Sequence, residues 1–376
     1  MNGNMRILFV TFNFNSTSIS GGFVVSSRNF QSLKEIPQTQ LIIEYPIKRK
    51  ISKTRISRKF DKLKDLYIDF ANLSFGGLDR KQELEIFELI SLHRINVVFL
   101  DSSLLGNLAK HIKNKFESCK VITFFHNFEY LFQSEQIKFN RSYHLFYRKH
   151  LSYINEKNAC IFSDYTIAIN KRDQVALEKK YRTKISDVIP VSLKDDNSIN
   201  KEKVGKENIP IGLFVGSNFY ANRQGIIWFC KNVLPFVRMK LYVVGRGMNH
   251  LKKFNFDTTK IEIYDRVEDL EYYYYKSDFV VIPIFVGSGM KVKTAEALMY
   301  GKFIFATNEA VSGYEIGKEC GIICNTKEEF VSALNSFNMN ENVFNYSSRQ
   351  LFLDKYSYEA TLINFYNLFD KVMETE

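Results

Sequence analysis

Short apolar runs rich in Val, Ile and Phe recur along the chain, separated by segments of helical length. The runs lack the strict alternation of a half-exposed strand, so they predict strands covered on both faces, as in parallel sheets. The segments between them repeat apolar residues at a spacing near 3.6, which predicts helices and an α/β fold. The predicted strands are Ile7–Phe12, Leu41–Tyr45, Val97–Leu100, Val121–Phe125 and Tyr165–Ile169, then Ile211–Val215, Leu241–Val244, Ile261–Tyr264, Phe279–Ile284, Phe303–Ala306 and Gly321–Cys324.

A polar, charged segment at residues 192–210 separates two halves that share this alternation of strands and helices. It contains little that a core could bury, so we expect it to be a linker between domains. We predict a Rossmann-like domain at 1–195, a second at 205–350, and a final helix at 351–376 that packs back on the first. Open parallel sheets bind ligands beyond the carboxyl ends of their strands, so the chemistry is expected in the loops there.

Length and cysteine content favour a two-domain protein of a reducing compartment. The 376 residues exceed one ordinary core. The five cysteines include no Cys-x-x-Cys pair and the histidines show no metal-ligand spacing, so neither a disulfide framework nor a metal site is expected. The apolar run at Ile7 is too short for a signal peptide, and no stretch reaches the roughly 20 apolar residues of a membrane span. These features predict a cytoplasmic protein.

The formal net charge of +11 is partly concentrated at residues 47–65, where nine Lys or Arg accompany apolar residues at helical spacing. A basic amphipathic helix can lie on an anionic membrane surface, which would place the protein at the inner face of the membrane. The alternative is a solvated helix whose apolar stripe packs on its own domain, and the pattern favours neither. A second basic, aromatic stretch at 138–150 favours the membrane slightly. No nucleic-acid recognition motif is present, so nucleic acid is not an expected partner.

The strongest candidate site is VGSGMKVKTAEALMYGK, residues 286–302, which follows a predicted strand and opens a helix. Gly287 and Gly289 permit close backbone approach to a ligand. The helix N-terminus offers unpaired amides and a positive dipole end to a phosphate, and Lys291 and Lys293 add charge there. The alternative is a plain turn followed by a solvated helix face, which this combination of residue types makes less favourable.

The same segment contains a carboxylate at Glu296, placed to accept hydrogen bonds from a pair of ribose hydroxyls. Fixed cations and amides can neutralise a departing diphosphate without a metal ion, so this segment needs no metal cofactor.

The segment GSGMKVKTAEALMYGKFIFATNEAVSGYE resembles the donor-binding segment of retaining nucleotide-sugar glycosyltransferases of family 4. IGLFVGSNFYANRQGIIWF and IEIYDRVEDLEYYYYKSDFVVIPIFVGSG resemble other units of that family's second domain, and HNFEY at 126–130 resembles its histidine loop. The likeness is strong over about 210–317 and diffuse before residue 120. It implies the GT-B fold, in which two Rossmann-like domains face each other across a cleft. It also implies that the donor binds to the second domain and the acceptor mainly to the first.

The resemblance implies roles for single residues. Glu296 matches the second Glu of the family's paired-glutamate motif, which holds the donor ribose. His126 matches the histidine beside the donor sugar and the reacting bond, which makes it the catalytic candidate. Arg223 lies near the family's basic diphosphate-binding residue. The other donor-binding candidates are loop positions, namely Gly22, Gly287, Ser288, Gly289 and Met290, together with the lysines Lys291 and Lys293.

Two positions depart from the family's pattern. The first Glu of the paired motif is replaced by Ser288, so the contact with the donor sugar, and hence the sugar itself, stays open. The Arg that many members place after the glycine of the second-domain loop is Ser217 here. Lys291 and Lys293 are the candidates to compensate for the missing Arg.

The residues and the resemblance together predict a metal-independent hexosyltransferase (EC 2.4) that needs no cofactor beyond a nucleotide sugar as substrate, such as a UDP- or GDP-sugar. The resemblance alone implies that the enzyme retains the anomeric configuration. It would transfer a sugar to a saccharide or lipid-linked saccharide acceptor, in surface polysaccharide biosynthesis. Two alternatives stay open. One is a nucleotide-sugar 2-epimerase on the same fold, which would act on the donor alone. The other is a non-catalytic glycosyltransferase-like binding subunit, which Ser217 and Ser288 leave open.

Overall fold

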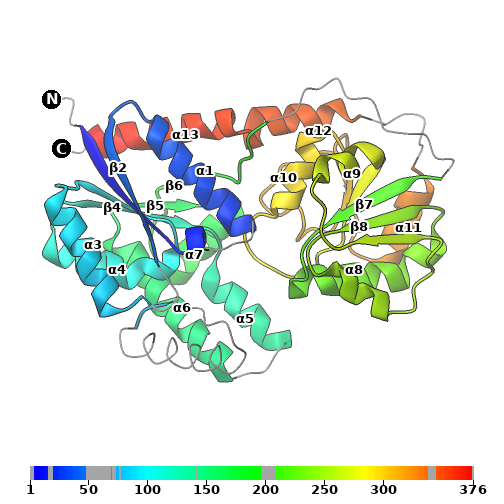
Figure 1. Cartoon of the computed structure of the whole chain (residues 1–376), viewed down its shortest axis with the longest axis horizontal. Helices are drawn as coiled ribbons and strands as arrows, with labels where there is room; N and C mark the ends of the chain where they lie inside the picture. The colour runs from blue at the N-terminus through cyan, green and yellow to red at the C-terminus, as the bar shows by residue number, and fades with distance from the viewer. Residues whose placement is uncertain are drawn as a thin grey trace. The chain divides into compact units, whose positions relative to one another are not determined.

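The computed structural model describes residues 4–15, 20–47, 69, 73–75, 78–139, 143–195, 209–337 and 344–374. The chain divides into two compact units (Figure 1). Unit 1 comprises Met1–Pro190 and Thr361–Glu376, and unit 2 comprises Val191–Ala360. Each unit is described by itself below.

Unit 1 is built on a six-stranded parallel sheet with the order β2-β1-β3-β4-β5-β6. Five of its strands correspond to the apolar runs predicted from the sequence. The sixth, β6, is two residues long and pairs with Ile167 and Ala168, too short to leave a periodic signal. The strands are β1 (Met5–Thr11), β2 (Thr39–Pro46), β3 (Val97–Leu100), β4 (Lys120–Phe125), β5 (Tyr165–Ala168) and β6 (Asp187–Val188).

Helices cover both faces of this sheet, as the unbroken apolar strands require. The side chains of Leu8 and Val10 pack with residues of α3 and α4 in one core cluster. Phe9, between them in sequence, points to the other face and contacts Phe30 of α1 with ring centroids 5.2 Å apart. The helices of this unit are α1 (Gly21–Glu35), α3 (Arg80–Leu92), α4 (Gly106–Lys115), α5 (Glu129–Phe139), α6 (Tyr143–Phe162), α7 (Lys171–Tyr181) and most of α13 (Tyr358–Glu374).

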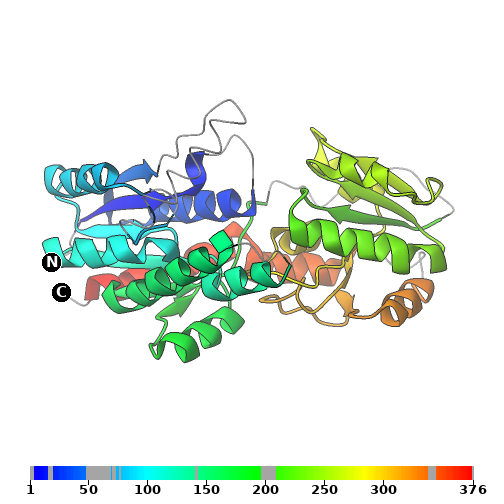
Figure 2. The same ribbon diagram turned by 90° about the horizontal axis from the view of Figure 1, so that it is seen from below.

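The C-terminal helix α13 lies along the unit formed by the first half of the chain (Figure 2). Its Tyr366 hydroxyl donates to the carbonyl of Glu35 at 3.2 Å. The Tyr165 hydroxyl at the start of β5 donates to the carbonyl of Lys371 at 3.0 Å. These two contacts tie residues more than 200 positions apart in sequence to one another.

Unit 2 repeats the architecture with the sheet order β12-β11-β10-β7-β8-β9, again all parallel. All six strands correspond to predicted runs, which confirms the α/β fold class with two parallel sheets. The strands are β7 (Ile211–Val215), β8 (Lys240–Val244), β9 (Ile261–Tyr264), β10 (Phe279–Ile282), β11 (Phe303–Ala306) and β12 (Gly321–Ile323). The helices are α8 (Tyr220–Asn232), α9 (Leu270–Lys276), α10 (Val292–Met299), α11 (Lys327–Asn335) and α12 (Tyr346–Leu351).

In both sheets the chain starts at an internal strand, builds one side of the sheet and then returns to build the other. The neighbouring strands β1 and β3 in unit 1, and β7 and β10 in unit 2, are followed by connections that lead in opposite directions. Such a switch point leaves a crevice at the carboxyl ends of the two strands, where α/β proteins bind ligands. The candidate site residues are therefore examined at these two edges.

The start of the predicted linker, 192–195, packs into unit 2. The backbone of Leu193 accepts from the amide of Tyr358 and donates to the carbonyl of Tyr356 at 2.9 and 3.1 Å. Asp195 forms a two-pronged ion pair with the guanidinium of Arg349 on α12. The rest of that segment, residues 196–208, lies outside the described residues.

Two further expectations concern membranes. The basic segment at 47–65 lies outside the described residues except for its first residue, Ile47, which is buried. No helix in the described part of the chain has the length and apolar character needed to cross a membrane.

Candidate functional site

The predicted glycine loop lies at the switch point of unit 2, between the end of β10 and the start of α10. Gly287 and Gly289 have φ values of +146° and +64°, a backbone conformation that residues with a side chain rarely adopt. Between them the Ser288 hydroxyl is buried and has no hydrogen-bond partner among the described residues. Met290 is buried, so only its backbone can serve a ligand. The loop therefore presents main chain at the carboxyl edge of the sheet.

Lys293, in the first turn of α10, reaches back across this edge to β7. Its ammonium group lies 2.6 Å from Oδ1 of Asn222 on α8 and 4.5 Å from the ring centroid of Phe214 on β7. A Cβ added to Gly216, at the end of β7, would come within 2.7 Å of the same ammonium. The pKa of Lys293 is lowered to about 7. Burial is the main cause, the charge of Glu296 opposes it, and the charge of Lys291 adds to it. A cation is thus held where water solvates it poorly, a position that favours an anionic ligand.

Glu296 lies one turn further along α10, on the same side of the helix as Lys293. Its carboxylate accepts from the hydroxyl of Tyr274 on α9 at 3.2 Å. Burial raises its pKa, while the Tyr274 hydroxyl and Lys293 oppose the shift. The Tyr274 ring is fully buried and stacks on Tyr300 at 4.3 Å between centroids, so the partner of this carboxylate is fixed by packing.

Lys291 takes a different direction from Lys293. Its ammonium group contacts the carbonyls of Ser288 and Gly289, both at 3.2 Å, and the Glu309 carboxylate at 2.6 Å. The sequence places the two lysines in the same turn, and the structure directs one to β7 and the other back onto the loop. Glu309 is a residue that the sequence analysis did not single out.

Arg223 lies in the first turn of α8, one residue beyond Asn222. Its side chain is exposed, and its backbone amide donates to the carbonyl of Phe219 at 2.9 Å. The residue before it on α8, Asn222, accepts a hydrogen bond from the ammonium of Lys293. Arg223 thus lies at the rim of the same edge, without a fixed direction for its guanidinium.

The switch point of unit 1 is organised around Asp101, which directly follows β3 and is fully buried. Its carboxylate accepts hydrogen bonds from Thr11 at the end of β1, from Ser26 and Asn29 on α1, and from Nε2 of His126 after β4. The bonds from Thr11 and Asn29 measure 2.9 Å and that from His126 measures 3.1 Å. Asp101 is not among the site residues predicted from the sequence. Its partners are 25 to 90 positions away, and no local pattern connects them.

His126 is consequently held in one orientation, with its ring against Phe124 at 5.1 Å between centroids. Burial by itself would lower its pKa, but the charge and hydrogen bond of Asp101, and more weakly Glu129, raise the pKa above the usual value. Asp101 and Glu129 are the ionisable groups that act on this imidazole. Behind the loop, Glu156 accepts from the amides of Glu129 and Tyr130 and caps the start of α5. Burial and the neighbouring Glu129 raise the pKa of Glu156 to about 8.

Gly22 lies in the first turn of α1, whose N-cap is Ser20. A Cβ at Gly22 would meet Oδ1 of Asn13 at 3.0 Å. The Asn13 side chain in turn donates to the Ser26 hydroxyl at 2.7 Å, which donates to Asp101. A continuous polar chain therefore connects the glycine turn to His126 within unit 1.

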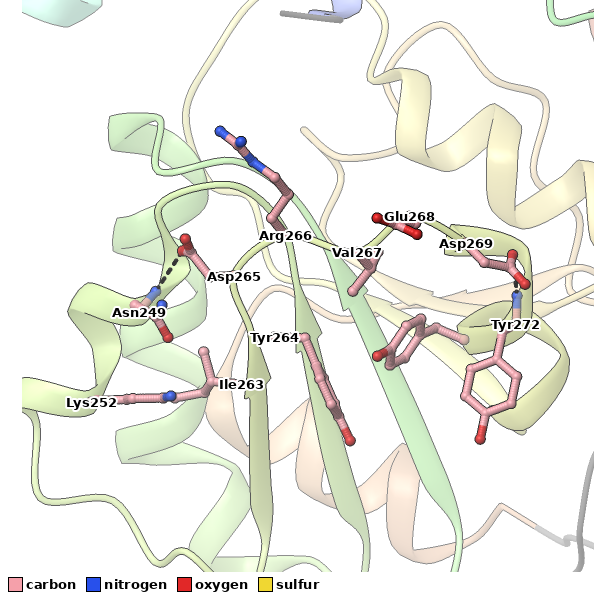
Figure 3. A pocket seen from close by; sticks show the side chains of 11 residues that line it. Asn249, Lys252, Ile263, Tyr264, Asp265, Arg266, Val267, Glu268, Asp269 and Tyr272 are labelled. Atoms are coloured by element: carbon pink, nitrogen blue, oxygen red, sulfur yellow. Dashed lines mark hydrogen bonds between the residues drawn. The ribbon is translucent and has the colours of Figure 1, made fainter.

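A pocket of about 690 Å³ lies beyond the carboxyl end of β9 (Figure 3). Asp265 accepts from the amide of Asn249 at 3.0 Å, and Asp269 caps α9 by accepting from the amide of Tyr272 at 3.1 Å. None of the site residues predicted from the sequence lines it. The lining residues are Asn249, Lys252, Ile263, Tyr264, Asp265, Arg266, Val267, Glu268, Asp269, Tyr272 and Tyr273.

Within the described residues, no group of three or more His, Cys, Asp or Glu side chains is placed to hold a metal ion.

Comparison with known protein families gives this geometry its context. Residues 209–338, which contain the whole glycine loop and α10, match the family "Glycosyl transferases group 1". The matched residues lie within unit 2 and make up about a third of the chain. They support the enzyme class predicted from the sequence, a glycosyltransferase (EC 2.4) that uses a nucleotide-sugar donor. No curated protein matches the chain.

Solved structures confirm the GT-B fold of this glycosyltransferase. Sucrose-phosphate synthase from Thermosynechococcus elongatus superposes with a TM-score of 0.73 at 13% identity, over 99% of this chain and 100% of that one. The lipopolysaccharide outer core galactosyltransferase WaaB in its apo form gives 0.64 at 12% identity, over 98% and 100%. HepE from Anabaena, in complex with UDP, gives 0.62 at 11% identity, over 99% and 100%. At these identities the likeness extends to the fold alone.

Proposed function

We propose that this glycosyltransferase moves a sugar from a nucleoside-diphosphate donor to a saccharide or lipid-linked saccharide acceptor, in surface polysaccharide biosynthesis. The anomeric configuration is retained and no metal ion takes part. The observation that carries the proposal is the poorly solvated ammonium of Lys293, held at the unit 2 switch point against Asn222 and Gly216. A diphosphate bound there gains a cation and the free amides at the start of α10 together.

In the reaction, the bond between the anomeric carbon and the diphosphate oxygen breaks through an oxocarbenium-like transition state. Lys293 stabilises the charge that develops on the leaving diphosphate, with Arg223 and Lys291 as further candidates. Glu296 accepts the ribose hydroxyls. His126 contacts the donor sugar, and Gly22 provides a turn without a side chain against which the donor can bind. The proposal assigns no nucleophilic carboxylate.

The pocket beyond β9 is our candidate for the nucleobase. Two strand spacings, roughly 10 Å, separate β9 from β7, and a nucleoside can span that distance. Tyr272 and Arg266 offer a ring face and a planar cation against which a base can stack. The UDP bound to HepE, a protein of the same fold, supports a uridine donor as the first to test.

The proposed acceptor rests on relatives of the same fold. WaaB is described as a lipopolysaccharide outer core galactosyltransferase, so its acceptor is a lipid-linked saccharide. The high positive charge of this chain, +11, suits an anionic acceptor or the anionic surface that contains it. We therefore propose that the enzyme works in the cytoplasm at the inner face of the membrane.

Membrane attachment has its own test through the basic segment at 47–65. We expect the protein to co-sediment with vesicles containing anionic lipid, and replacement of the Lys and Arg of this segment by Ser to reduce the bound fraction several-fold. Each basic residue near such a surface contributes roughly 1 kcal/mol. Equal sedimentation of both proteins would remove this segment as the anchor.

The function itself is tested with a panel of nucleotide sugars. We expect one donor to raise the melting temperature, and to be consumed quickly only when an acceptor from a saccharide or lipid-linked panel is present. Rapid conversion of the donor alone into an epimer would identify a 2-epimerase instead. Absence of binding to UDP, GDP and every sugar nucleotide would indicate a non-catalytic subunit.

Glu296→Ala is expected to lower kcat/KM by about ten- to hundredfold while the protein stays folded. A charge-assisted hydrogen bond to a ribose hydroxyl contributes about 1.5–3 kcal/mol, and this variant removes it. Tyr274→Phe is the matched control, since it removes the hydroxyl that holds Glu296 but leaves the carboxylate. Steady-state kinetics with the identified donor measure both. Nearly full activity in Glu296→Ala would count heavily against the ribose assignment.

A further inference from the structure

The carboxylate that the sequence analysis found missing at Ser288 has a counterpart elsewhere in unit 2. Glu309 lies in the turn after β11, the strand next to β10, and both turns end at the carboxyl edge of the sheet. Its Oε1 would lie 3.5 Å from a Cβ added at Gly287. The same ammonium, that of Lys291, binds both Glu309 and the carbonyl of Ser288. A carboxylate therefore reaches the glycine loop from the neighbouring strand.

Several contacts fix this turn in place. Thr294 on α10, which is fully buried, donates to the carbonyl of Ala310 at 2.8 Å. The Tyr314 hydroxyl donates to the carbonyl of Lys291 at 2.8 Å. The Thr307 hydroxyl donates to the carbonyl of Ile284, at the start of the glycine loop. Glu309 is thus held against the loop by its neighbours, as a group that must recognise a ligand in one geometry has to be.

We propose that Glu309 binds hydroxyl groups of the donor sugar and sets the enzyme's choice of that sugar. This inference rests on the proposed donor site at the glycine loop. A carboxylate has two oxygens that can each accept more than one hydrogen bond, so Glu309 can bind the Lys291 ammonium, at 2.6 Å, and a ligand hydroxyl together. Sugar hydroxyls are neutral donors, and a charged acceptor roughly doubles the strength of the bond they make.

The proposed contact differs from that of Glu296. Glu296 lies inside the first turns of α10, where Tyr274 and Lys293 surround it, and it is assigned to the ribose. Glu309 lies on the side of the loop that faces β11. The competing interpretation is that Glu309 is a latch, which here means an ion pair with Lys291 that only stabilises the conformation of the glycine loop. Both interpretations predict that substitution of Glu309 lowers activity. The test must therefore measure binding of the sugar separately from binding of the nucleotide.

The test compares the affinity for UDP with that for the UDP-sugar that gives the largest thermal shift, both by calorimetry. In Glu309→Gln we expect UDP affinity to change by less than twofold and UDP-sugar affinity to fall by about ten- to hundredfold. Glu315→Gln is the matched control, because it removes another carboxylate of unit 2 that pairs with a lysine, Lys355, and it should change neither value.

Lys291→Gln provides the second, independent measurement, since it breaks the same ion pair but keeps the carboxylate. We expect it to preserve the ratio of UDP-sugar to UDP affinity within about threefold, whereas a latch requires it to behave like Glu309→Gln. Equal loss of UDP and UDP-sugar affinity in Glu309→Gln would overturn the proposal and leave the donor site intact as a hypothesis. Unchanged UDP-sugar affinity would also overturn it. Failure of the wild-type protein to bind either compound would overturn the donor site, and this inference with it.

Discussion

Replacing Lys293 with Met is expected to lower kcat/KM for transfer by about ten- to hundredfold while leaving the melting temperature unchanged or slightly raised. The variant removes the cation that faces the leaving diphosphate, and a charge-assisted contact of this kind contributes about 1.5–3 kcal/mol. It keeps an apolar side chain against the ring of Phe214. Because burial already disfavours the ammonium, losing the charge should not destabilise the protein.

The pH dependence of donor binding provides a sharper signature of Lys293. Its pKa is about 7 without ligand, and a bound diphosphate must raise it because the opposite charge favours the protonated form. Binding is then coupled to proton uptake above pH 7. We expect affinity for the nucleotide sugar to be constant below pH 7 and to fall by up to tenfold per pH unit above it. The sugar diester does not itself titrate in this range, so calorimetry in two buffers can measure the uptake directly.

The matched control for this experiment is Lys355→Met, which removes a partly exposed lysine that pairs with Glu315 in the same unit. It should retain both the activity and the proton uptake of the wild type. Lys293→Met should bind more weakly and show no uptake. Undiminished proton uptake in Lys293→Met would assign the titration to another group and remove Lys293 from the diphosphate site.

The strands of this fold could be read from the sequence because burial on both faces makes them continuous apolar runs. Every predicted run in the second half matches a strand. The run Ile211–Val215 is β7 with the same bounds, and the run Phe279–Ile284 contains β10, which ends at Ile282. The strand at Asp187–Val188 could not be found, since two half-buried residues carry no period. What the periodicity does not contain is the order of strands in the sheet. That order, which creates the two switch points, is seen only in the folded structure.

Some features of the candidate site also follow from the sequence and others only from the fold. Lys293 and Glu296 are three residues apart on a helix, so helical geometry places them on the same side of it. The direction of Lys291 does not, because it depends on a partner, Glu309, supplied by the next strand of the sheet. Asp101 was missed for a similar reason. Its importance lies in donors from β1, α1 and the loop after β4, which only the folded sheet edge brings together.

Asp101→Asn is expected to have the second large effect, through His126. The variant removes the negative charge that raises the pKa of the imidazole, and its amide group offers a donor to Thr11, Ser26 and Asn29, which already donate. Transfer should fall by about ten- to hundredfold, and the limb of the pH–rate profile that reflects His126 should move to lower pH. Stability should fall by about 1–3 kcal/mol, since buried polar groups lose their acceptor.

The pH dependence of the free energy of unfolding tests the effect of Asp101 on the pKa of His126 without any substrate. A histidine with a raised pKa in the folded state contributes stability that is complete below the unfolded value of about 6.5 and disappears as the pH rises through the folded pKa. Wild-type stability should therefore decline over that interval, and the decline should vanish in Asp101→Asn. Ser26→Ala, which removes one donor and keeps the carboxylate, should lose stability yet preserve the slope. A slope that survives in Asp101→Asn would show that another group, such as Glu129, controls the charge of His126, and Asp101 would then be a structural residue only.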